Sequence, residues 1–189
     1  MTVLSTLNHR NCCNPGHSIF LSFPDQLAAK YEEIFPPEVV KLAYITDGAY
    51  NRAEIVEMES VIAKALDYNL TVPTIHSFLC RYLKAAHADR QMVRVTCYLA
   101  ERSLQEYCML QYCPSVIAAT SVLIARKTLE RHAWSATLVK YTNYDEDDLL
   151  ACNAKMGLYI NEAFPKHGAV KLKYYSPNFG GVSKLKMVM

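Results

Sequence analysis

The stretch AAKYEEIFPPEVVKLAYITDGAY, residues 28–50, joins a charged cluster to an apolar helix. The cluster KYEE at residues 30–33 lies where one predicted helix ends, because Pro36 and Pro37 follow it and proline does not fit a helix interior. Pro37 fits the first turn of a second helix, which is mostly apolar and is therefore predicted to be mostly buried. No residue here forms a catalytic pattern. Charges placed just before a hydrophobic helix favour a surface that binds a partner.

The flanking residues mark the start of the first of these helices and predict a third. Asp25 is a candidate cap for the helix that leads into the charged cluster, and Asn51 is a candidate cap for a helix that runs to about Tyr68. Within that last helix, Glu59 lies along a largely apolar face, where a carboxylate is costly unless it is paired. Two interpretations stay open: a rim position with the carboxylate in water, or a contact with a partner.

Five further helices are predicted between Pro73 and Phe164. The first is expected to start at Pro73, and from Ile75 its apolar residues recur at i, i+3, i+4, i+7 and i+8, a helical periodicity as strong as any in the chain. The others begin at four capping or first-turn residues: Asp89, Pro114, Ser135 and Asp145. The helix from Pro114 is apolar on all sides as far as Arg126, so we expect it in the centre of a ring of the other four.

These patterns predict an all-α protein, since no segment shows the alternation of a strand. The basic tail, residues 166–189, is expected to dock only in part and then to fray. A formal net charge of +2 disfavours nucleic acid as a partner. We expect no membrane association, because no apolar run approaches the roughly 20 residues of a membrane span. Seven scattered cysteines favour a reduced intracellular compartment with free, mostly buried thiols.

The candidate chemical sites all have simpler explanations. His9, Cys12, Cys13 and His17 could suggest zinc, but their spacing matches no ligand pattern, so residues 1–24 are interpreted as an irregular leader. The acidic run at residues 145–148 suits a first helical turn better than a calcium loop. His76 and Cys80 share a helix face, and we expect them to be buried or half-buried rather than to bind metal. No sequence motif of a hydrolase, nucleotide-binding protein or metalloprotease occurs, so an enzyme is disfavoured and no metal or cofactor is expected.

Several segments together resemble the A- and B-type mitotic cyclins. KYEEIFPPEV, YITDGAY and EMES are similar to the end of the first cyclin box, and LTVPTIHSFLCRYLKAA is similar to the linker and opening helix of the second. LAERSLQEYCMLQYCPSVIAA, WSATLVKYTNYDEDDLLAC and YYSPNFGGVSKL continue the resemblance to the end of the family's fold. It extends over about residues 27–185. It implies a cyclin fold: a complete five-helix second box at residues 71–165, after a truncated first box at residues 25–70.

The resemblance also implies a function. Cyclins are not enzymes; they bind a cyclin-dependent kinase and hold its αC helix inward, so that the kinase's Lys–Glu ion pair can form. Lys30 and Glu59 match the Lys and Glu that contact the kinase together. Apolar positions around that contact are matched by Tyr31, Ala63, Tyr68 and Leu70. The family further implies control of the G2/M transition, and a location in nucleus and cytoplasm.

The sequence departs from the family pattern before residue 28. Most of three helices of the first box, including the one that carries the substrate-docking patch, have no counterpart in residues 1–24. We therefore expect that substrate docking through this patch is absent and that kinase binding is weakened or lost. Two alternatives to a kinase regulator stay open: a helical adaptor that uses the cyclin fold to bind protein or nucleic acid, and a non-functional truncated cyclin whose second box folds alone.

Overall fold

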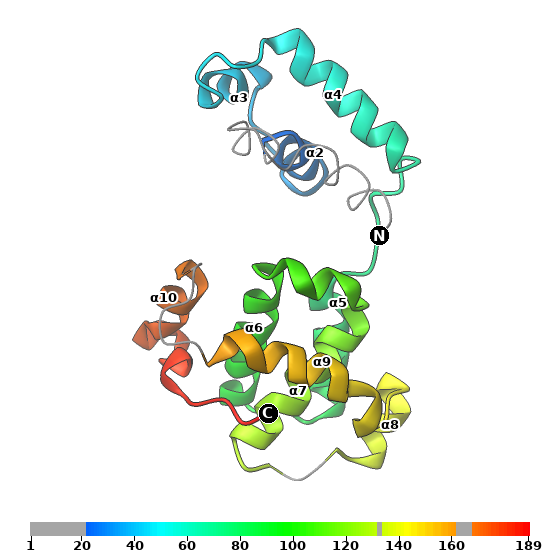
Figure 1. The fold of residues 1–189 in the computed structure, drawn as a ribbon, viewed down its shortest axis with the longest axis vertical. Coiled ribbons are helices and arrows are strands. Elements are labelled where there is room, and N and C mark those ends of the chain that lie inside the picture. The colour runs from blue at the N-terminus through cyan, green and yellow to red at the C-terminus, as the bar shows by residue number, and fades with distance from the viewer. Residues whose placement is uncertain (1–21, 132–133, 162–167) are drawn as a thin grey trace. The chain divides into compact units, whose positions relative to one another are not determined.

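The computed structural model describes residues 22–131, 134–161 and 168–189. The chain forms two compact units, Met1–Val72 and Pro73–Met189, which we call the N-terminal and C-terminal units (Figure 1). All regular secondary structure in the described ranges is helical, which confirms the all-α prediction.

From residue 22 onward, the N-terminal unit contains three helices: α2 (Ser22–Glu32), α3 (Val39–Ile45) and α4 (Arg52–Ala65). Helix α4 packs against both α2 and α3. Its start at Asn51 is confirmed: the Asn51 side chain accepts hydrogen bonds from the backbone N–H groups of Ala53 and Glu54, and Glu54 accepts one in return from the Asn51 backbone. This double cap fixes where α4 begins.

Three expected helix boundaries in this unit are wrong. Asp25 lies inside α2, which begins at Ser22 because Pro24 fits a first turn, where no backbone N–H is needed. Pro37 precedes α3, whose cap is Glu38 in an extended conformation. Helix α4 ends at Ala65, and Tyr68 follows in a left-handed turn with φ of 55°. Residues 1–21 of the expected leader lie outside the described residues.

The described part of the C-terminal unit contains the five predicted helices and four shorter elements. The five helices are α5 (Ile75–Ala85), α6 (Arg90–Leu104), α7 (Pro114–Thr128), α8 (Ala136–Thr142) and α9 (Glu146–Ile160). The shorter elements are the 3-10 helices η2 (Tyr107–Gln111), η3 (Pro177–Phe179) and η4 (Val182–Lys184), and helix α10 (Ala169–Tyr175). Asp89 and Ser135 cap α6 and α8 as predicted, and Pro114 opens α7. Helix α5 begins at Ile75 with Thr74 as its cap, two residues later than Pro73 suggested.

Helix α7 lies at the centre of the C-terminal unit, as its all-round apolar sequence predicted. Every residue from Ile117 to Arg126 is buried, and α5, α6 and α9 pack around it. Helix α8, the fourth member of the expected ring, packs mainly against α5. The central position follows from the sequence because a helix with no polar face is stable only when it is covered on all sides.

The expectation that the tail frays is wrong for residues 168–189. Tyr174, Val182 and Met187 are buried against the core of the C-terminal unit. The Asn161 side chain exchanges two hydrogen bonds with the Met187 backbone, at 3.0 and 3.1 Å. The Thr128 hydroxyl accepts a further one from the backbone N–H of Val188. Three separated apolar residues thus anchor a segment whose composition alone suggested a loose tail.

The thiols are less buried than we expected. Among the described cysteines all are free, and Cys152 alone is fully buried, while Cys80 and Cys113 are exposed. His76 is also exposed, with its Nε2 3.5 Å from the Cys80 Sγ, so the expected buried or half-buried role of this pair is wrong. Both lie on the outer face of α5, one helical turn apart.

Candidate partner-binding site

Lys30 and Glu59 form an ion pair that ties α2 to α4. The Lys30 Nζ lies 2.7 and 2.8 Å from the two carboxylate oxygens of Glu59. The lysine side chain is 42 % exposed and the glutamate 18 %, so the pair lies at the rim of the α2–α4 contact. Glu59, which the sequence placed on an apolar face, therefore has its charge partner within the chain itself. Lys30 also lies in the last turn of α2, where the helix dipole stabilises a positive charge.

The other four predicted contact residues surround this pair unequally. The Tyr31 hydroxyl is hydrogen-bonded to the hydroxyl of Thr71, while its ring is half exposed. Ala63 is buried within the unit, and its carbonyl accepts a hydrogen bond of 2.9 Å from the backbone N–H of Tyr68. The Tyr68 ring projects outward, and Leu70 is partly exposed. Tyr31 and Tyr68 thus offer surface to a partner, whereas Ala63 supports the end of α4.

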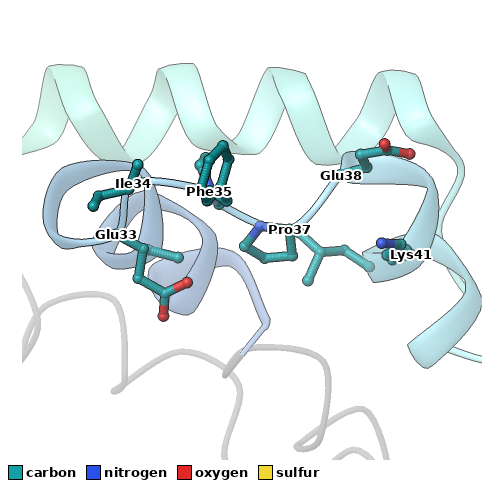
Figure 2. A pocket seen from close by; sticks show the side chains of 9 residues that line it. Glu33, Ile34, Phe35, Pro37, Glu38 and Lys41 are labelled. Atoms are coloured by element: carbon teal, nitrogen blue, oxygen red, sulfur yellow. The ribbon is translucent and has the colours of Figure 1, made fainter.

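The connection between α2 and α3 presents apolar side chains that sequence reasoning missed. Ile34 and Phe35 are 89 % and 88 % exposed. They border an open hollow whose walls also include Pro37 and two acidic residues, Glu33 and Glu38 (Figure 2). An available signal was the position of Ile34 and Phe35 between a helix end and two prolines, where neither side chain can join a helix face.

Helix α3 is far less buried than its apolar sequence predicted. Leu42 is its one fully buried residue, and it packs with Ile55 of α4. Val40, Tyr44 and Ile45 are exposed. Helix α3 has seven residues and packs against α4 through Leu42, and the apolar residues that point away from this contact stay exposed. Exposed apolar groups of this extent favour association with a partner.

The described residues supply no obvious site for metal chemistry. No group of three or more His, Cys, Asp or Glu side chains within the described ranges could hold an ion. In the acidic run, Asp148 accepts a hydrogen bond from the backbone N–H of Asp145, which supports the helix-cap interpretation. His9, Cys12, Cys13 and His17 lie outside the described residues. Within the described ranges, no helix has the length and apolar character that crossing a membrane requires.

Comparison with known proteins gives two family matches, and the boundary between them falls at the same place in the sequence as the boundary between the two units. The model described as "Cyclin, N-terminal domain" matches residues 26–71, and "Cyclin, C-terminal domain" matches residues 73–187. The chain belongs to the cyclin family. All six predicted contact residues lie in the first of these matches, and α5 to α9 lie in the second.

The relatives of this cyclin are mitotic cyclins from plants and animals. It is 41% identical to "G2/mitotic-specific cyclin-2" of Medicago sativa over 84% of this chain and 49% of the relative. It is 42% identical to "G2/mitotic-specific cyclin-B" of Marthasterias glacialis over 84% of this chain and 42% of the relative. With "G2/mitotic-specific cyclin-A" of Hydra viridissima the identity is 40%, over 84% and 39%. The chain spans half or less of the length of these relatives.

Proposed function

We propose that this cyclin is the regulatory, activating subunit of a cyclin-dependent protein serine/threonine kinase that acts at the G2/M transition. The observation that carries the proposal is the Lys30–Glu59 pair, a charged contact at the surface of α2 and α4 with exposed apolar side chains beside it. The names of the relatives support the mitotic assignment. In this proposal the chain supplies no catalytic group, and the kinase carries out the chemistry.

The pair has bonding capacity left for a kinase. A lysine ammonium has three donors, and two contacts reach the Glu59 carboxylate. Because 42 % of the Lys30 side chain is exposed, a backbone carbonyl of the partner can accept from the remaining donor. The carboxylate keeps unused lone pairs that can accept from a partner N–H. A partner that covers this pair would also exclude water from it and so strengthen both contacts.

The neighbouring apolar residues supply apolar surface that a partner can bury, which a charged pair alone does not provide. Tyr31 and Tyr68 project from the ends of α2 and α4, and Phe35 projects from the connection after α2. Aromatic residues that become buried at an interface are among those in which binding energy is usually concentrated. We infer that a helix of the kinase packs against this face, with its apolar side toward the aromatic rings.

The test is binding of the full chain to a purified cyclin-dependent kinase, together with the protein-kinase activity of the complex. Wild-type chain should bind and activate the kinase, although more weakly than its longer mitotic-cyclin relatives, and the double variant Lys30→Ala with Glu59→Ala should do neither. A control pair exists in the C-terminal unit, where Lys127 and Glu146 form an ion pair of 2.6 Å with side chains 32 % and 38 % exposed. Removing that pair should leave kinase binding unchanged. Failure of the wild-type chain to bind any cyclin-dependent kinase would overturn the proposal.

A location in nucleus and cytoplasm belongs to the same proposal, since a mitotic kinase regulator must reach substrates in both. Fluorescence imaging of the tagged chain in dividing cells would test it. A signal confined to one secretory or mitochondrial compartment would contradict it.

A further inference from the structure

The two units carry opposite charge. Residues 73–189 contain fifteen Lys and Arg against nine Asp and Glu, whereas residues 1–72 contain five against nine. The small net charge of the whole chain therefore conceals a basic C-terminal unit. Such a surplus raises the local concentration of anionic partners and speeds their association. What matters is whether any of these cations gather at one place without acidic neighbours.

Arg94 and Lys184 meet at the turn formed by Gly180 and Gly181, which we call the glycine corner. The Arg94 Nη2 donates a hydrogen bond of 3.1 Å to the backbone carbonyl of Asn178. A Cβ at Gly180 would lie 2.9 Å from the Arg94 Nη1, so the guanidinium rests directly against this turn. Both glycines have left-handed φ, +75° and +62°, a backbone conformation that allows the turn to pass close to the arginine.

Lys184 is held on the other side of the same corner. Its side-chain carbons lie 3.7 and 3.8 Å from a Cβ placed on Gly181, and its Nζ lies 4.2 Å from the centre of the Tyr175 ring. Both cations are thus positioned by neutral groups, a backbone carbonyl and an aromatic face. Neither contact cancels their charge, and both reduce the conformational entropy that binding an anion would cost.

No carboxylate among the described residues pairs with the corner or its two flanking cations. Arg90 lies one helical turn before Arg94 on α6, and Lys186 lies two residues after Lys184. None of these four side chains takes part in an ion pair within the described ranges. Farther along α6, Glu101 is already occupied by the Lys173 ammonium, at 2.8 Å, and by the Tyr174 hydroxyl.

We propose that the glycine corner, with Arg90 and Lys186, is a docking site for an acidic, Asp- or Glu-rich segment of a protein partner. The planar guanidinium of Arg94 matches a carboxylate in a two-bond geometry, and Lys184 adds a point charge beside it. A nucleic acid fits the corner less well, because base stacking needs a free ring face. Tyr175 and Phe179 are partly exposed, but Lys184 lies over the ring of Tyr175 and Lys173 over that of Phe179, so an ammonium competes with a base for each ring. This proposal does not depend on the kinase proposal, since it concerns the C-terminal unit.

The test is fluorescence anisotropy of a labelled Glu-rich peptide with the full chain and no kinase. A peptide with Gln in place of every Glu serves as the ligand control. Arg94→Gln with Lys184→Gln should weaken binding of the Glu peptide roughly tenfold, as expected for two lost ion pairs at a surface. Added salt should weaken the wild-type complex strongly and the variant complex much less.

A charge-matched variant separates a specific site from a general attraction. Lys140→Gln with Lys155→Gln removes the same charge from α8 and α9 and should change the affinity by less than about twofold. If Arg94→Gln disturbs folding, as circular dichroism would reveal, Arg90→Gln with Lys186→Gln gives an independent measurement, with an expected loss of roughly threefold. Equal losses in all variants, or tighter binding of a single-stranded oligonucleotide than of the Glu peptide, would overturn the proposal.

Discussion

Reversing the Lys30–Glu59 pair separates its role in folding from its role in binding. In Lys30→Glu with Glu59→Lys, the two charges exchange helices and can pair again across the same 2.7 to 2.8 Å contacts. The original pair lies at a rim, so it contributes about 0.2–1 kcal/mol to the free energy of unfolding. The reversed pair should recover most of this. It loses about 0.3–1 kcal/mol, because a glutamate in the last turn of α2 opposes the helix dipole.

Kinase binding should respond differently. In the proposed complex, the kinase donates hydrogen bonds to the carboxylate on α4 and accepts them from the ammonium on α2. Reversal therefore places an ammonium against the kinase's donors and a carboxylate against its acceptors. Loss of a covered, hydrogen-bonded charge typically costs about 2–5 kcal/mol of binding, or roughly 30- to 4,000-fold in Kd. The single variants Lys30→Ala and Glu59→Ala and the reversed variant should therefore share a large loss of affinity, although their stabilities differ by only about 1 kcal/mol.

Two measurements are needed on the same samples. Urea unfolding followed by circular dichroism gives the change in stability, and calorimetry or biolayer interferometry with the kinase gives the change in Kd. The reasoning is refuted if the reversed variant recovers wild-type kinase affinity, since the pair would then act only as a clamp between α2 and α4. It is also refuted if either single variant loses more than about 2 kcal/mol of stability, because the loss of kinase binding would then reflect unfolding of the chain rather than loss of a contact.

Three other predictions concern the C-terminal unit. Leu123→Ala in the centre of α7 should cost about 2–5 kcal/mol in urea unfolding, whereas the exposed Leu150→Ala should change stability by less than about 0.5 kcal/mol; similar costs at both sites would contradict the central position of α7. Burial raises the pKa of Tyr159 above its ordinary value of 10.0, so its contribution to stability is complete below pH 10 and is lost as the pH rises further, because the unfolded tyrosine ionises first. The urea midpoint should therefore fall less steeply between pH 8 and pH 11 in Tyr159→Phe than in wild type. Equal pH dependence of the two midpoints would refute a raised pKa for Tyr159. Burial also raises the pKa of the Cys152 thiol, so alkylation mapped by mass spectrometry should label Cys80 in the native chain and Cys152 only after unfolding.

Local signals determined most helix starts. Asn51, Asp89 and Ser135 each accept the backbone hydrogen bonds that their residue type and position predicted, because a helix start depends on groups only two or three residues away. The same locality explains the errors. Pro24 is tolerated in a first helical turn, so α2 includes residues before Asp25, and Glu38 is extended, so α3 begins after Pro37.

The sequence by itself determined that this is an all-α cyclin, and it named Lys30 and Glu59 as residues of one site. Only the tertiary structure decided that the two side chains, 29 residues apart, meet across α2 and α4. It also decided that Phe35 is exposed while the tail residue Met187 is buried. Capping and periodicity are properties of neighbouring residues, so a sequence displays them directly. Burial and ion pairing depend on which residues from distant parts of the sequence pack against a side chain. Those contacts form only when the helices pack together.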